Sequence, residues 1–234
     1  MNKTVKLLVA SIVAIAANSA IAESGNWYIG AGAGVSSYKD WVSQDDIMAF
    51  KNEFGASLGI VNFTGTESAD SEDSAPGFKL FGGYAFNENI AVELSYIDMG
   101  EVDANSRSTG TFFDAADNPV DGDLFASAKA SITAFTLDAS LNYPIASFAA
   151  LFVKAGVYAA DTKLELSAGS SISPDNINDS RTESSSGLHV GIGASFRVTD
   201  AVGLRAEWER LDNVEADGGE SDVDLISAAL IYSF

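Results

Sequence analysis

Charged residues recur at alternate positions within otherwise apolar segments, and their types and spacing are the best guide to chemistry. On a β-strand, alternate side chains point to opposite faces, so these residues share one face opposite the apolar row. Buried ions cost several kcal/mol unless they are paired, and we therefore expect a salt-bridge network, either a plug that fills the interior or a small gated ion path. Its expected members are four cations and three anions, namely Lys79, Lys154, Arg197, Arg205, Glu93, Asp138 and Glu207.

The composition excludes most catalytic and metal chemistry. The chain has no cysteine and one histidine, His189, which rules out thiolate chemistry and any site that needs two imidazoles. An envelope hydrolase would pair a histidine with a serine or carboxylate, but His189 falls on the charged face, and no serine stands two residues on. We expect no enzyme activity and no cofactor. Asp117, Asp121 and Asp123 are the remaining metal candidates, although their spacing does not match an EF-hand loop.

The segments that carry the charged residues have a two-residue apolar period, which predicts β-strands. Eight such segments cover residues 27–35, 78–86, 90–97, 135–143, 151–158, 188–198, 202–209 and 225–234. Their apolar rows end in aromatic residues, which is typical of lipid-spanning strands, and glycine on the other row suits a narrow interior. We therefore predict an all-β fold, a transmembrane antiparallel up-and-down β-barrel of eight strands, in preference to a secreted β-sandwich.

The connections between these strands alternate in length. Three are short turns, at 87–89, 144–149 and 199–201, and four are long and polar, near 39–76, 98–126, 161–186 and 210–223. Short turns on one side and long extracellular loops on the other are typical of outer-membrane barrels. An even number of strands then puts both termini on the short-turn, periplasmic side.

The long segments hold most of the acidic residues. Thirteen Lys and Arg against 33 Asp and Glu give a net charge of −20, which excludes a nucleic-acid binder because phosphate contacts need basic residues. Such an acidic crown beside lipopolysaccharide either keeps the protein dispersed by repulsion or bridges to phosphates through divalent cations.

A short amphipathic helix is indicated inside the segment 39–76. Ser43 precedes Asp46 by three residues, which resembles a capping box, and helical spacing follows at Ile47, Phe50, Phe54 and Leu58. Its apolar face would pack on neighbouring loops or bind a host or phage surface.

The first residues form a secretory signal peptide. Lys3 and Lys6 precede the apolar run 7–17, and Ala20-Ile21-Ala22 is an A-x-A cleavage site. We expect residues 1–22 to be removed and residues 23–234 to form the barrel domain. No later apolar run reaches 18 residues, so a helical membrane protein is not expected.

Several short motifs resemble the membrane barrel of the outer membrane protein A family. They are Gly82-Gly83-Tyr84, Val92-Glu93-Leu94-Ser95-Tyr96, Asn142-Tyr143-Pro144-Ile145 and Leu204-Arg205-Ala206-Glu207-Trp208. Leu230, Tyr232 and Phe234 at the end of the chain resemble the C-terminal signal that the barrel-assembly machinery reads. The resemblance implies a monomer in the outer membrane of Gram-negative bacteria, in contact with lipid and lipopolysaccharide. Because the chain stops at the last strand, the cell-wall anchoring of longer members is not expected.

The resemblance also bears on the lumen. It implies that Glu93 and Arg205 match an ion pair that closes the lumen of the relatives, while Ser140 and Ser195 stand where the relatives have an alternative acid–base pair. We therefore expect low conductance that rises in Glu93→Ala. The expected role is structural and interactive: presenting acidic loops and supporting envelope integrity or surface adhesion. The alternative is a low-conductance channel, a small porin gated by the lumen salt bridges.

Overall fold

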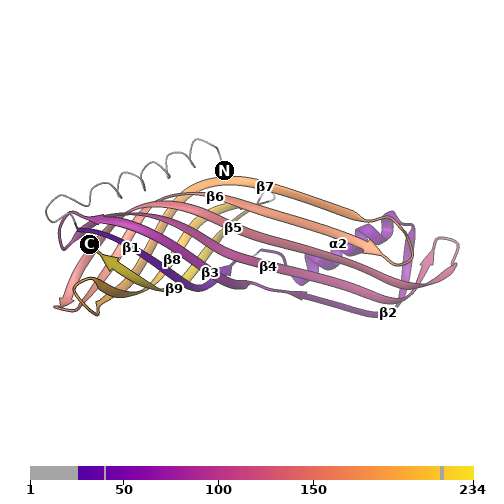
Figure 1. Cartoon of the computed structure of the whole chain (residues 1–234). Helices are drawn as coiled ribbons and strands as arrows, with labels where there is room; N and C mark the ends of the chain where they lie inside the picture. The colour runs from indigo at the N-terminus through magenta and orange to yellow at the C-terminus, as the bar shows by residue number, and fades with distance from the viewer. Residues whose placement is uncertain (1–25, 40, 217–218) are drawn as a thin grey trace.

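The computed structural model describes residues 26–39, 41–216 and 219–234 (Figure 1). The predicted signal peptide, residues 1–22, lies outside these ranges. The described elements are β1 (Asn26–Tyr38), α2 (Gln44–Ser57), β2 (Ile60–Ser71), β3 (Ser74–Ala85), β4 (Ile90–Asp114), β5 (Pro119–Ala146), β6 (Ala149–Ser170), β7 (Ile177–Arg197), β8 (Val202–Ala216) and β9 (Gly219–Ser233).

Eight of these strands close into a ring. They pair antiparallel in the order β4-β3-β1-β9-β8-β7-β6-β5, and β5 pairs again with β4. All eight segments with a two-residue period lie in these strands, so the predicted eight-stranded barrel is confirmed. Closure removes free strand edges, which hydrocarbon could not satisfy with hydrogen bonds.

The barrel is apolar outside and polar inside. Ile29, Leu137 and Leu230 point outward and are between half and two-thirds exposed, whereas Lys79 and Glu93 point inward and are buried. A soluble sandwich would have the opposite arrangement, because its apolar row faces a shared core. The outward row therefore faces lipid.

Aromatic residues mark the two ends of this apolar band. Close ring pairs lie at the short-turn end, as in Tyr232 with Phe234 at 5.2 Å between ring centroids, and at the opposite end, as in Tyr96 with Phe135 at 5.2 Å. Such girdles lie at the two membrane interfaces. The chain's one described helix is too short and too polar to cross a bilayer.

The start of β1 and the end of β9 lie together at the short-turn end of the barrel. The Phe234 N–H donates a hydrogen bond to the Trp27 carbonyl at 3.0 Å. The connections at this end, 86–89, 147–148 and 198–201, are all short. The expected alternation of connection lengths is therefore present at this end.

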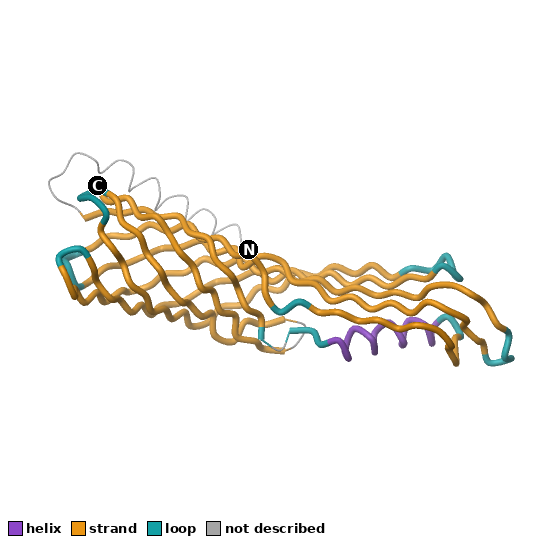
Figure 2. Tube along the Cα trace, turned by 90° about the horizontal axis from the view of Figure 1, so that it is seen from below, coloured by secondary structure: helices purple, strands orange, loops and turns teal. Residues whose placement is uncertain are grey.

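At the other end, the segments expected as long loops are mostly extended strand. β4 pairs with β5 as far as Phe113 with Pro119, and β6 pairs with β7 as far as Ala168 with Ile177. Figures 1 and 2 show these strands continuing well beyond the barrel. The polar side chains hid the strands from sequence analysis, but main-chain pairing needs no apolar residues. Fourteen residues of β4, 101–114, project about 45 Å along the strand at about 3.3 Å a residue.

We call this projection the outer sheet. It consists of β2 with the ends of β4 (101–114), β5 (119–131), β6 (163–170) and β7 (177–185), in the order β2-β4-β5-β6-β7. β2 was not predicted, because residues 60–71 are mostly polar on both faces. It pairs with the part of β4 that projects beyond β3.

The helix α2 covers one face of the outer sheet, as Figure 2 shows in purple. Its N-terminus has the expected capping box: the Ser43 hydroxyl accepts from the Asp46 N–H at 3.1 Å, and the Ser43 N–H donates to the Asp46 carboxylate at 3.1 Å. Ile47 and Phe54 are buried in a second core together with Ala104, Phe112, Leu124, Ala126, Ala128 and Ala168. The predicted helix is confirmed, and its apolar face packs on the neighbouring strands.

Candidate functional site

The inward-pointing charges of five strands meet in one buried layer inside the barrel. Glu93 on β4 lies beside Arg205 on β8, whose guanidinium Nη1 donates to the carboxylate at 2.6 Å, and the Tyr28 hydroxyl donates to it at 3.1 Å. The Arg205 guanidinium also lies over the rings of Phe81 and Phe152, with its Cζ 4.6 and 4.7 Å from the two ring centroids. Aromatic faces attract a cation, so this arginine is held from several sides.

Two lysines extend the layer. Lys79 Nζ lies 2.6 Å from Glu207, 2.8 Å from Glu209 and 3.6 Å from Glu93. Lys154 Nζ contacts the same three carboxylates, at 3.1 Å from Glu207, 3.5 Å from Glu93 and directly against Glu209. Because each ammonium is shared among three carboxylates, the members stabilise one another as a network rather than as separate pairs.

Glu209 belongs to this network although the sequence analysis did not include it. It stands two residues after Glu207, so the same period that selected Glu207 would have selected it. It is fully buried, and its carboxylate contacts both lysines and the His189 ring.

His189 completes the layer. Its Nδ1 lies 2.7 Å from Asp138 and its Nε2 lies 3.3 Å from Glu209. Asp138 also accepts a hydrogen bond from the Thr136 hydroxyl at 2.7 Å. The buried layer thus holds four carboxylates, three permanent cations and an imidazole that lies between two of the carboxylates. The ring is fully buried in the lumen, as expected from its position on the charged face.

One expected member lies elsewhere. Arg197 is exposed at the last residue of β7, next to the short turn 198–201, and is not in the buried layer. The two-residue period continues to Arg197, but the packed interior ends before it, so parity alone misplaced this side chain. The other six predicted residues are brought together.

An apolar layer fills the lumen between the charged layer and the outer sheet. Its buried members come from seven strands, and the fully buried ones include Ile97, Met99, Val102, Ile132, Leu211, Val223 and Leu225. Leu211 is paired with His189, so the two layers are in direct contact. Sequence analysis missed this second closure, because Met99, Val102, Leu211 and Val223 lie where the strands were expected to have given way to loops, and only Ile97 and Leu225 fall at the ends of predicted strands.

The three candidate metal ligands do not form a site. Asp117 lies in the turn 115–118, Asp121 accepts from the Thr111 hydroxyl at 2.6 Å, and Asp123 pairs with Arg107 at 3.0 Å. The hydrogen bond from Arg107 lowers the pKa of the Asp123 carboxyl. Nowhere in the part of the chain that the structure describes do three or more His, Cys, Asp or Glu side chains gather as metal ligands.

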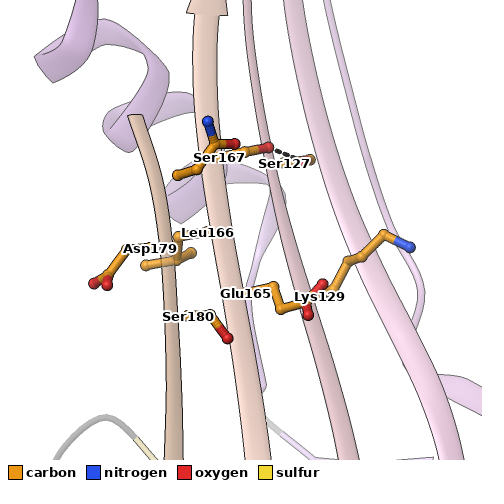
Figure 3. A pocket seen from close by; sticks show the side chains of 8 residues that line it. Ser127, Lys129, Glu165, Leu166, Ser167, Asp179 and Ser180 are labelled. Atoms are coloured by element: carbon orange, nitrogen blue, oxygen red, sulfur yellow. Dashed lines mark hydrogen bonds between the residues drawn. The ribbon is translucent and has the colours of Figure 1, made fainter. Parts of the chain in front are cut away.

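A shallow polar groove of about 370 Å³ lies on the outer sheet at β5, β6 and β7 (Figure 3). Ser127 and Ser167 share a hydrogen bond of 2.7 Å across its floor, and Lys129 beside it binds Glu101 at 2.7 Å. The other charged lining residues, Glu165 and Asp179, are likewise paired, with Lys163 and Arg181.

The closed antiparallel ring, with an apolar exterior and a charged interior, defines a β-barrel membrane protein. The family described as the OmpA-like transmembrane domain matches residues 22–234, and the chain belongs to this family. It is therefore a protein of the bacterial outer membrane.

Solved structures of outer-membrane barrels are similar to this chain. Ail of Yersinia pestis, solved in complex with the heparin analogue sucrose octasulfate, is 16% identical over 89% of this chain and 99% of that chain, with a TM-score of 0.45. Neisserial surface protein A is 16% identical over 91% of this chain and 100% of that chain, with a TM-score of 0.46. OprG of Pseudomonas aeruginosa is 14% identical over 90% and 96%, with a TM-score of 0.47. No curated protein matches the chain.

Proposed function

We propose that this protein is a non-enzymatic surface protein that uses its barrel as an anchor and its outer sheet, with α2, as an interaction module. The observation that carries the proposal is that two layers of side chains, one charged and one apolar, fill the lumen, while most of the chain outside the barrel forms ordered strands and a helix. A structure that projects about 45 Å from the barrel is placed to reach partners beyond the membrane surface.

The filled lumen favours anchoring over transport. A solute would have to displace both the ion network around Glu93 and the apolar layer around Leu211 and Leu225. The large apolar side chains of this layer form a constriction across the lumen that disfavours water and ions. The low-conductance channel is therefore the weaker proposal, and the expectation that Glu93→Ala opens a path must be revised.

The position of His189 supports a non-enzymatic role. An acid–base histidine must reach its substrate, but this ring lies in the lumen with Asp138 and Glu209 on its two nitrogens. The fully buried ring leaves no space where a lipid or peptide bond could approach. We propose no cofactor for the protein.

The biogenesis and surroundings proposed for the protein follow from the outward side chains. Leu230, Tyr232 and Phe234 are all exposed on the outside of the last strand, where the barrel-assembly machinery could read them as a C-terminal signal. We further propose periplasmic termini, a monomeric barrel and contact of the outer sheet with lipopolysaccharide.

Removing the outer sheet while keeping the barrel tests the function. The deletions end at residues that already lie side by side on neighbouring strands. Glu101 is joined to Ser131, and Asp161 is joined to Ser184. Tyr38 is joined to Asp73, whose carbonyl already accepts from the Tyr38 N–H at 2.8 Å. Cells that display the truncated barrel should lose adhesion to host cells or phage adsorption, while the barrel keeps its resistance to unfolding. Undiminished adhesion at equal surface levels would refute the proposal.

A further inference from the structure

The outer sheet has two edges that no described strand covers. Beyond the barrel, β2 pairs only with β4, and residues 177–188 of β7 pair only with β6, because β8 joins β7 from His189 onward. An edge strand presents a row of main-chain N–H and C=O groups to which another extended chain can pair. The two edges differ in how well they are protected.

The β7 edge carries charged residues that discourage pairing. Asp179, Arg181 and Glu183 are paired with Leu166, Leu164 and Thr162 of β6, so they lie on the sheet face that α2 covers in part. Asp179 binds Arg181 at 2.9 Å. Charges on the inner face of an edge strand oppose the addition of another strand, because a partner would have to cover them.

The β2 edge lacks that protection. Its sequence from Asn62 to Ser71 has neither proline nor a basic residue, and most of its side chains are small. Its inner-face acid, Glu67, is already bound by the buried ammonium of Lys51. Ten residues, Asn62–Ser71, pair with β4 in continuous register, which leaves a straight edge about 33 Å long.

Hydrogen bonding shows which groups of β2 face away from β4. The Glu72 N–H donates to the Asp103 carbonyl at 2.8 Å, so even-numbered residues bond to β4, because the pattern alternates in an antiparallel pair. The Phe63 N–H instead donates to the side chain of Asn62 at 2.8 Å, as an outward-facing odd-numbered residue would. Gly65, Glu67 and Ala69 therefore offer their main-chain groups to a partner.

The charge around this edge selects the partner. Asp70 on β2 and Glu72 just after it lie near Asp103 on β4, and Asp103 and Asp70 raise the pKa of the exposed Glu72 carboxyl by repulsion. Lys129, which lies opposite Asp103 on β5, is already paired with Glu101, and Arg107 on β4 is paired with Asp123. A basic segment would relieve the repulsion among these acids, whereas a second copy of β2 added antiparallel would place only its uncharged Asn62 end there.

We infer that the free edge of β2 binds an extended, basic peptide segment of a partner protein as an added antiparallel strand. Main-chain bonds at Gly65, Glu67 and Ala69 would supply affinity, and the acids at the Asp70 end would hold lysine or arginine near the N-terminus of the added segment. This inference rests on the proposed interaction role and names the surface and the class of partner.

The test uses the full mature protein refolded in lipid nanodiscs. The probe is a labelled ten-residue peptide of alternating threonine and valine with three N-terminal lysines, and fluorescence anisotropy measures its binding. Two matched peptides serve as controls, one with glutamates in place of the lysines and one N-methylated on alternate amides. We expect binding of the lysine peptide, at least tenfold weaker binding of both controls, and slower hydrogen exchange along β2.

Two variants at one position separate the edge from its side chain. Ala69→Pro removes an outward N–H without breaking a bond to β4, and proline is tolerated on edge strands, whereas Ala69→Val keeps the N–H and adds bulk. We expect at least tenfold weaker binding in Ala69→Pro and less than a twofold change in Ala69→Val. If Ala69→Pro fails to fold, a second variant tests the inference. Asp70→Asn combined with Asp103→Asn leaves the main chain intact and should weaken binding of the lysine peptide at low salt.

The outcomes separate this inference from the proposed function. Equal binding to Ala69→Pro and wild type, equal binding of the glutamate peptide, or an edge occupied by a second copy in concentrated nanodiscs would each overturn the basic-strand inference. Adhesion that survives removal of the whole outer sheet would instead refute the interaction role, whatever the peptide does.

Discussion

At the scale of single residues, Lys51 is the least expected feature of the outer sheet. It lies on the apolar face of α2 and is fully buried, with its ammonium bound to Glu67 on β2 and, at 2.6 Å, to the Ser108 hydroxyl on β4. Its aliphatic stem packs like an apolar residue while its charged end reaches a carboxylate. One side chain thus joins α2 to two strands.

This junction predicts how α2 responds to pH. The hydrogen bond from Lys51 lowers the pKa of Glu67 below its ordinary 4.5. A carboxyl whose pKa is lowered by folding contributes stability above its unfolded pKa and loses it as pH falls through the folded value. The protection of α2 amides against hydrogen exchange, relative to the intrinsic exchange rate at each pH, should therefore fall progressively below about pH 4.5.

Glu67→Gln provides the control for that acid sensitivity. It should remove most of the pH dependence between pH 6 and 3 and loosen α2 by about 1–3 kcal/mol at pH 7, because the buried ammonium loses its charged partner. Lys51→Met should cost less, since methionine fills the same space and the half-exposed Glu67 returns to water. If Lys51→Met loosens α2 more than Glu67→Gln, the proposed cause is wrong.

His189 gives a second test at residue scale. His189→Phe keeps a ring of similar size but removes the Nδ1 partner that lies 2.7 Å from the buried Asp138 carboxylate, which then keeps only the Thr136 hydroxyl. A buried carboxylate that loses one of its two hydrogen-bond partners costs about 1–3 kcal/mol, so the urea midpoint of the refolded barrel should fall. His189→Gln, which keeps a donor, should lose less than His189→Phe, and the reverse order would contradict the hydrogen-bonding role.

The element scale shows what sequence patterns can and cannot reveal. The lipid-facing strands were predicted because hydrocarbon demands an apolar residue at every second position, and α2 was indicated because the hydroxyl of Ser43 and the carboxylate of Asp46 are capping groups. The strand β2 was missed because polar side chains on both faces leave no period, and the ends of β4–β7 were missed because their inner row is mostly small alanine, as at Ala104, Ala126 and Ala128, between polar residues. Their pairing is satisfied by main-chain bonds, which leave no pattern in the side chains.

The same contrast holds for the charged layer. Parity placed Glu93, Arg205 and the two lysines together, since a narrow barrel leaves inward charges no other neighbours. It failed at Arg197, where the packed interior ends, because a period contains no information about depth. It would have succeeded at Glu209, which follows the same parity.

A prediction at this scale concerns the cap of α2. Ser43→Ala removes the hydroxyl that accepts from the Asp46 N–H at 3.1 Å and should destabilise the helix by about 1 kcal/mol. Hydrogen exchange in the first turn of α2 should speed up about fivefold, while the barrel strands stay unchanged. Ser43→Asp keeps an acceptor and serves as the control. A change that spreads to β1 would show that the cap supports more than the helix.

At the scale of the whole molecule, the barrel is closed by two layers of different chemistry. The charged layer is held by geometry that a single substitution can break, as at Glu93, whereas the apolar layer is held by packing among Met99, Ile132, Leu211 and Leu225. Water and ions avoid a narrow apolar constriction even when charged groups on one side of it rearrange. The two layers therefore contribute unequally to the seal.

Planar-bilayer recording distinguishes the two layers. We expect wild type and Glu93→Ala to conduct little, because the apolar layer remains in either protein. Leu211→Ser with Leu225→Ser should raise conductance slightly, and the combination with Glu93→Ala should raise it several-fold more, since only then are both closures open. Leu137→Ser, on the lipid-facing side, controls for general loosening of the barrel. Large currents from Glu93→Ala alone would instead make the ion network the gate and restore the channel as the leading function.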